Sequence, residues 1–138
     1  MQLSNYLNKS EIYLDVAEMA EKSYKYPAVA HCAYYGCFHL MQHIWCHKMG
    51  KTEKELEMEC SSKKTGRHAI LIKEVGLFIK NNTKNRTAQQ DFQSFNSKII
   101  QLKKLRENAD YKDEMFDCVK SSNSRTLAND LIPILKRA

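Results

Sequence analysis

Apolar residues recur at three- and four-residue steps along most of the chain, a spacing that places them on one face of a helix. No segment alternates apolar and polar residues as a half-buried strand does. The sequence therefore predicts an all-α fold, a single domain over residues 1–138 built as an antiparallel bundle of four or five helices. Four helices are expected over residues 4–22, 27–49, 66–80 and 87–109. The last helix is expected to begin after Ser124.

Residues at the ends of these segments support the expected boundaries. Pro27 lacks a backbone N–H and has a fixed φ, so it suits the first turn of a helix. Gly50 suits the position just after a helix ends. Thr87, followed three residues later by Gln90, has the spacing of a capping box, in which a side chain and a backbone N–H bond reciprocally.

Two segments fit the helical pattern less well. Residues 51–65 are charged and lack a full apolar face, so we expect a surface connection with one helical turn around Leu56. We expect this connection to be the most mobile part of the chain. Ser124 is the expected cap of the last helix, and Pro133 inside that helix should kink or shorten it because proline removes a backbone donor.

Charge and cysteine usage narrow the class of protein. The 22 basic and 16 acidic residues give a net charge of +6. A basic chain fits a partner that carries phosphates, although proteins without such partners are also often basic. The five cysteines include no C-x-x-C pair, which fits a reducing cytoplasm. No apolar run approaches the roughly 20 residues of a membrane helix, so we expect a cytoplasmic protein with no membrane partner.

An arginine lies in the apolar stripe of the predicted helix 87–109. Asp110 follows Arg106 by one turn and can pair with it, which leaves the guanidinium free to bind a phosphate, and Tyr111 lies beside them. The spacing alone favours an ion pair that only closes the helix end. The alternative is a site that binds a phosphate. The residues in register with Arg106 are Phe92, Phe95, Ile99 and Leu102.

Three segments resemble the HEPN domain family (higher eukaryotes and prokaryotes nucleotide-binding), in the family's order. LRENADY (105–111) is similar to the end of its final helix, YPAVAHCAYYGCFHLMQHI (26–44) to its second helix, and GRHAILIKEVGLFIK (66–80) to its third. The resemblance covers most of residues 1–111. It implies a helical bundle that commonly forms a homodimer, with the arginine-bearing helices of two subunits lining a basic cleft. The resemblance thus favours binding of a nucleotide or RNA by Arg106, Asp110 and Tyr111. It also implies links to RNA cleavage, to toxin–antitoxin pairs and to a nucleotidyltransferase partner protein.

The chain departs from the ribonuclease pattern of that family. Active members carry a histidine after the arginine, separated by four to six residues, whereas positions 111–113 here are Tyr, Lys and Asp. A histidine is the group that exchanges protons near neutral pH. We therefore expect binding without hydrolysis. One alternative is a metal-independent endoribonuclease in which His68 or Tyr111 replaces the histidine and Arg106 carries the phosphate charge. The other is a module that binds a protein.

The helix over residues 27–49 carries a second group of reactive side chains. His39, His43 and His47 recur at four-residue steps, and Cys32 and Cys46 share their face, so the ligand types are those that zinc prefers. Three such histidines cannot all reach one ion from a straight helix, and the usual glutamate between two of them is missing. We expect a solvent-exposed face or a subunit contact rather than a metal site, and we expect no cofactor.

Overall fold

The computed structural model describes residues 4–138, and these residues form six α-helices and one π-helical turn, with no strand. The predicted all-α class is confirmed for this part of the chain, although the bundle has more helices than the four or five expected. The elements are α1 (Asn5–Lys22), α2 (Tyr26–His43), the π-helical turn η1 (Ile44–Lys48), α3 (Glu53–Lys63), α4 (Arg67–Lys80), α5 (Ala88–Tyr111) and α6 (Cys118–Arg137).

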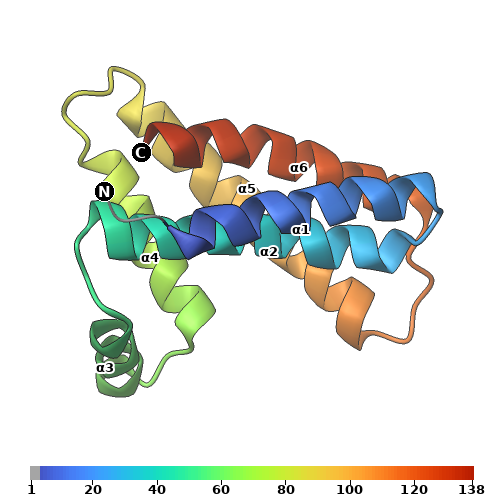
Figure 1. Cartoon of the computed structure of the whole chain (residues 1–138), viewed down its shortest axis with the longest axis horizontal. Helices are drawn as coiled ribbons and strands as arrows, with labels where there is room; N and C mark the ends of the chain where they lie inside the picture. The colour runs from blue at the N-terminus through green and yellow to red at the C-terminus, as the bar shows by residue number, and fades with distance from the viewer. Residues whose placement is uncertain (1–3) are drawn as a thin grey trace.

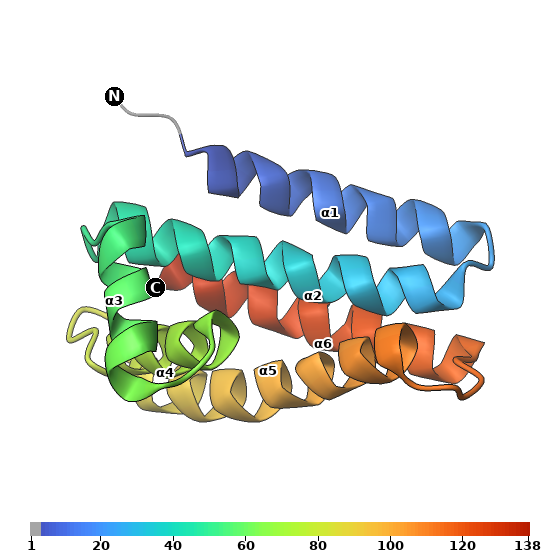
Figure 2. The ribbon, with the colours of Figure 1, turned by 90° about the horizontal axis from the view of Figure 1, so that it is seen from below.

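The long helices α1, α2, α5 and α6 lie side by side (Figure 1). Helices α1 and α2 run in opposite directions, and so do α5 and α6. The shorter helices α3 and α4 lie together at one end of this array (Figure 2). Helix α2 is central because it packs against α1, α4, α5 and α6, and 11 of its 18 residues are buried. None of the helices in residues 4–138 is long and apolar enough to span a membrane.

Gly36 allows α1 to approach α2 closely. A Cβ atom at this position would lie 2.6 Å from Cδ2 of Leu14 and 2.7 Å from its Cγ, closer than real Cβ contacts. The buried hydroxyl of Ser10 donates to the Gly36 carbonyl at 2.7 Å, a short bond between the two helices. The absence of a side chain at residue 36 therefore sets the spacing between α1 and α2.

Helix α3 is the largest departure from the sequence prediction, which gave this segment only one helical turn. Its cap explains the difference: the Thr52 hydroxyl accepts from the Glu55 N–H at 3.1 Å, and the Glu55 carboxylate accepts from the Thr52 N–H at 3.3 Å. Leu56 is 1% exposed and is the one buried residue of the helix. A capping box and a single anchor thus form an 11-residue helix that has no apolar face.

The capping box predicted at Thr87 is wrong. Thr87 makes no side-chain bond to the backbone of α5, and its hydroxyl donates to the Asn85 amide oxygen at 2.9 Å. The start of α5 is fixed instead by Asp91, which accepts from Nη2 and Nε of Arg137 at 3.0 and 3.2 Å. This two-pronged ion pair ties the first turn of α5 to the last turn of α6, and α5 continues to Tyr111 rather than ending at Ala109.

The start predicted for the last helix is also wrong. Helix α6 begins at Cys118, because the Asp117 side chain accepts from the Lys120 N–H at 3.0 Å and caps the helix more than a turn before Ser124. Ser124 is buried within the helix, and its hydroxyl donates to the Lys120 carbonyl at 2.9 Å. Pro133 does not end the helix, which continues to Arg137 with the proline on its exposed side.

Candidate functional site

Arg106 lies on the buried face of α5, and its side chain is only 7% exposed. Its guanidinium carbon is 5.2 Å from the ring centre of Tyr34 and 5.4 Å from those of Tyr35 and Tyr111. Aromatic rings at this distance attract a cation through the negative charge of their faces. Arg106 is therefore a buried cation enclosed by tyrosine rings from α2 and from the end of its own helix.

The Arg106 guanidinium is only partly paired. Nη1 donates to the Tyr111 hydroxyl at 3.1 Å and lies 3.8 Å from Oδ2 of Asp110, whereas the buried Nε makes no hydrogen bond within residues 4–138. Leaving a buried donor unpaired costs about 1 to 3 kcal/mol. The structure thus brings together the predicted residues Arg106, Asp110 and Tyr111. It also shows the guanidinium covered by Tyr111, where the helical spacing had indicated an open group.

Asp110 also contacts a histidine that the sequence analysis did not select. Nδ1 of His31 on α2 lies 2.7 Å from Oδ2 of Asp110, and the His31 ring lies 4.8 Å from the ring of Tyr35. The His31 side chain is 43% exposed, and its Nε2 makes no hydrogen bond to the described residues. A carboxylate that holds one imidazole nitrogen while the other has no partner among the described residues is the arrangement of an oriented acid–base group.

The sequence held part of the signal for His31. His31, Tyr34, Tyr35 and Phe38 have the spacing i, i+3, i+4 and i+7, which places them on one face of a helix. That face is the one that contacts Arg106. The partner Asp110 is 79 residues away along the chain, so no local pattern links it to His31.

His68, the predicted substitute for the missing histidine, lies behind the tyrosines. Its Nδ1 is 2.7 Å from the Tyr34 hydroxyl, and its ring stacks on Phe38 at 4.3 Å. Burial, followed by the nearby cations Arg106 and Lys103, lowers the pKa of His68 to about 4. The imidazole is therefore neutral near pH 7 and is hydrogen-bonded to Tyr34, so it supports the tyrosine and is poorly placed to exchange protons with a ligand.

Two of the three histidines His39, His43 and His47 contact other parts of the same chain. Nδ1 of His39 bonds the Gln42 amide oxygen at 3.0 Å, and its ring lies 5.1 Å from that of Tyr13 on α1. His43 bonds the Ser4 hydroxyl at 2.7 Å. Contacts with α1 and with Ser4 thus leave His39 and His43 half-buried, and the expected solvent-exposed face or subunit contact stays a prediction. His47 is exposed and stacks on His43 at 5.3 Å.

No three His, Cys, Asp or Glu side chains within residues 4–138 lie together as ligands of one metal ion would. The weak metal candidates His39, His43 and His47 are therefore not gathered around a common point. Comparisons of the chain with protein-family models, with curated proteins and with solved structures find no match.

Proposed function

We propose that the protein is a HEPN-like binding module that holds a nucleotide or single-stranded RNA at Arg106. The observation that carries this proposal is the buried Arg106 guanidinium, whose Nε is unpaired. It is covered by Tyr111, a residue that is itself 72% exposed. An exposed ring above a buried cation offers stacking to a base and charge to a phosphate. The opposite directions of α1 and α2, and of α5 and α6, agree with the antiparallel bundle that the resemblance implies.

Binding requires one local movement. Tyr111 is the last residue of α5, and the chain leaves the helix at Lys112, so rotation of the tyrosine ring disturbs no packed core. Once Tyr111 turns outward, a phosphate oxygen can accept from Nε and a second from Nη2, the two donors that point to the same side of the guanidinium. Paired hydrogen bonds of this kind are the strong mode in which arginine recognises phosphate.

The rings around the cation supply the remaining contacts. Tyr35 and His31 lie side by side on α2, and the displaced Tyr111 can stack on a base from the other side. Stacking of a base on an aromatic side chain contributes about 1 to 3 kcal/mol and tolerates any sequence. The net charge of +6 adds an attraction that falls with salt concentration. The ligand class is therefore a phosphate joined to a base.

The experiment that tests the proposal is fluorescence anisotropy with a labelled single-stranded RNA and with a labelled nucleotide. Arg106→Gln is expected to weaken binding about tenfold or more, because a charged hydrogen bond is lost. Arg86→Gln removes the same charge from an exposed loop position and is the matched control, with affinity expected to stay within about twofold. Unchanged affinity in an Arg106→Gln protein that keeps its circular-dichroism spectrum would contradict the proposal.

A second candidate function, a metal-independent endoribonuclease, is favoured by the contact between His31 and Asp110. His31 Nε2 would take the proton of a ribose 2′-hydroxyl. The 2′-oxygen then bonds to phosphorus as the bond from phosphorus to the 5′-oxygen breaks. The leaving oxygen takes a proton from water, and Arg106 stabilises the charge on the phosphoryl oxygens. The products are a 2′,3′-cyclic phosphate and a 5′-hydroxyl.

The cleavage candidate has a direct test. Purified protein is incubated with end-labelled RNA in the presence of a chelator, and the product ends are identified. Cleavage that is lost in His31→Ala but kept in His47→Ala, an exposed histidine on the same stretch of chain, would support it. No cleavage by the natural sequence would retire this candidate and leave the binding proposal untouched. The homodimer and the nucleotidyltransferase partner that the resemblance implies stay predictions.

A further inference from the structure

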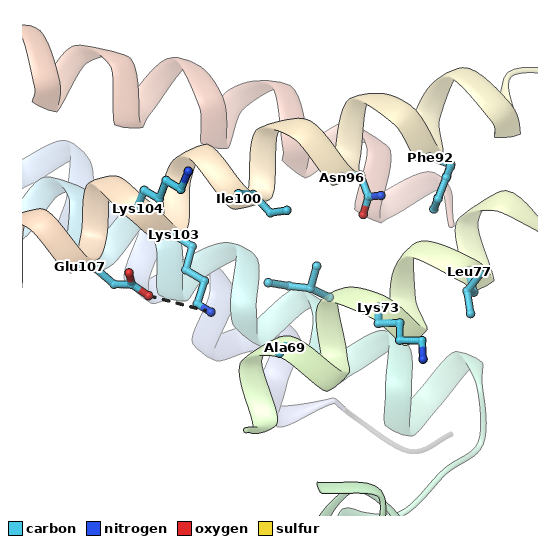
Figure 3. Close-up of a pocket in the computed structure, with 10 residues that line it drawn as sticks. Ala69, Lys73, Leu77, Phe92, Asn96, Ile100, Lys103, Lys104 and Glu107 are labelled. Carbon is cyan, nitrogen blue, oxygen red and sulfur yellow. Dashed lines mark ion pairs between the residues drawn. The ribbon is translucent and has the colours of Figure 1, made fainter. Parts of the chain in front are cut away.

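An apolar groove with a basic rim runs between α4 and α5 (Figure 3). It has a volume of about 530 Å³. Its α5 side runs from Phe92 to Glu107, a length of about 20 Å at the helical rise of 1.5 Å per residue. Leu77 and Ile100 on its two sides are 39% and 46% exposed. The cations at its rim are Lys73, Lys103 and Lys104.

The form of the groove favours a helix as its occupant. A small-molecule site usually has polar groups fixed in a mostly enclosed cavity. Here the polar residues Lys73, Asn96 and Lys104 are exposed, and no buried polar side chain is aimed into the groove. A trough about four helical turns long, with an apolar floor and lysines at its edge, matches an amphipathic helix with acidic residues beside its apolar stripe.

Helix α1 of the same chain carries such a face on its outer side. Ile12, Val16 and Met19 follow one another at helical spacing and are 51%, 41% and 65% exposed. They point away from the buried residues Ser10 and Ala17, which pack towards α2. Five of the ten large apolar side chains that are exposed within residues 4–138 thus belong to this stripe or to the groove. Exposed apolar patches of this kind mark interaction surfaces.

The acidic residues along one edge of the stripe complement the lysines at the rim of the groove. Glu11 and Asp15 lie along one edge of the stripe, and neither makes an ion pair within the described residues. Lys73 and Lys104 at the groove likewise make none. Opposite charges beside two apolar surfaces favour contact between them and fix its register.

We propose that the groove between α4 and α5 binds the outer face of α1 from a second copy of this chain. Helix α1 forms one edge of the bundle and α5 the opposite edge (Figure 2). A single pair of copies therefore uses one groove and one α1 face, and leaves the other groove and the other α1 free. The contact joins two different surfaces, so it repeats from copy to copy into a ring or an open chain. This assembly does not depend on ligand binding at Arg106.

The test is sedimentation of the full chain from micromolar to millimolar concentration. Lys73→Glu with Lys104→Glu reverses the groove charge, and Glu11→Lys with Asp15→Lys reverses the α1 charge. Each pair is expected to weaken association about tenfold or more, because like charges then face one another. Lys54→Glu with Lys84→Glu makes the same change in net charge as the groove pair, at exposed positions outside both surfaces, and should leave association unchanged.

Mixing the two charge-reversed proteins gives the most specific test of the contact. The acidic groove of one then meets the basic α1 of the other, while their natural surfaces also match, so association is expected to return. A natural chain that keeps the mass of one copy throughout would overturn the proposal. A mass that stops at two copies and does not respond to the α1 substitutions would also overturn it. The same holds if neither pair of substitutions weakens association, or if mixing the two reversed proteins does not restore it.

Discussion

Nδ1 of His31 and Oδ2 of Asp110 lie 2.7 Å apart and join the first half of α2 to the end of α5. The same carboxylate oxygen is 3.8 Å from Nη1 of Arg106, so one acid serves both the imidazole and the guanidinium. The contact links residues that are 79 positions apart and fixes the end of α5 beside the tyrosines of α2. The Asp110 carboxylate therefore links the site residues of α2 to those at the end of α5.

A double-mutant cycle measures that contact. His31→Ala, Asp110→Ala and the double variant are compared with the natural chain by urea denaturation. We expect a coupling energy of about 0.5 to 1 kcal/mol, because both side chains are partly exposed and water screens their attraction. The pair His47→Ala and Asp113→Ala, exposed residues on the same two stretches of chain, should show no coupling. A coupling no larger than that of the control pair would show that the contact contributes nothing.

His68 makes the stability of the protein depend on pH. Its folded pKa is about 4, below the ordinary value of 6.5, so the unfolded chain binds a proton at a higher pH than the folded chain does. The contribution of neutral His68 to the free energy of unfolding is therefore fully present above pH 6.5. It is lost as the pH falls from 6.5 towards 4. His68→Gln should flatten the loss of unfolding free energy over this window. An imidazole NMR signal of His68 that titrates near 6.5 would contradict the account.

Gly36 gives a prediction about packing. Gly36→Ala places a methyl group 2.6 Å from Leu14, so α1 must shift or Leu14 must change its rotamer. Overpacking of this kind costs about 1 to 3 kcal/mol of unfolding free energy. Gly66→Ala is the matched control, because a Cβ atom there meets nothing within 4 Å. Equal effects of the two substitutions in urea denaturation would show that α1 and α2 are not closely packed at this point.

The capping box at Thr52 gives a prediction about α3. Thr52→Ala removes the hydroxyl that accepts from the Glu55 N–H, and such a cap contributes about 1 kcal/mol. Hydrogen exchange of the α3 amides should become faster in this variant, while exchange in α2 stays the same. Thr83→Ala, an exposed loop threonine, serves as the control. Fast exchange over residues 53–63 in the natural chain itself would favour the surface connection that the sequence predicts.

The sequence predicted α1, α2 and α4 well because each has an apolar face that recurs with the helical period. It missed α3, in which only Leu56 is buried, because a capping box and one anchor leave no periodic pattern. Helix starts were misplaced where two polar residues compete, as Asp117 does with Ser124, since only the folded backbone decides which side chain bonds an N–H.

The candidate site was predictable only in part. Arg106, Asp110 and Tyr111 follow one another on a single helix, so their spacing was sufficient to group them. The sequence indicated an open guanidinium, whereas Tyr34 and Tyr35 cover it in the structure. This cover depends on how α2 packs against α5, which helical spacing alone does not give. His31 was missed for the same reason, since packing between distant helices decides its partner.

The most direct test of the central claim is the NMR signal of the Arg106 Nε–H group during titration with a nucleotide or single-stranded RNA. This buried donor has no partner within the described residues, so it is the group that a bound phosphate would pair. We predict that its resonance shifts strongly as ligand is added, while the Arg86 signal in the exposed loop does not. A ligand that binds with no change at Arg106 would contradict the account.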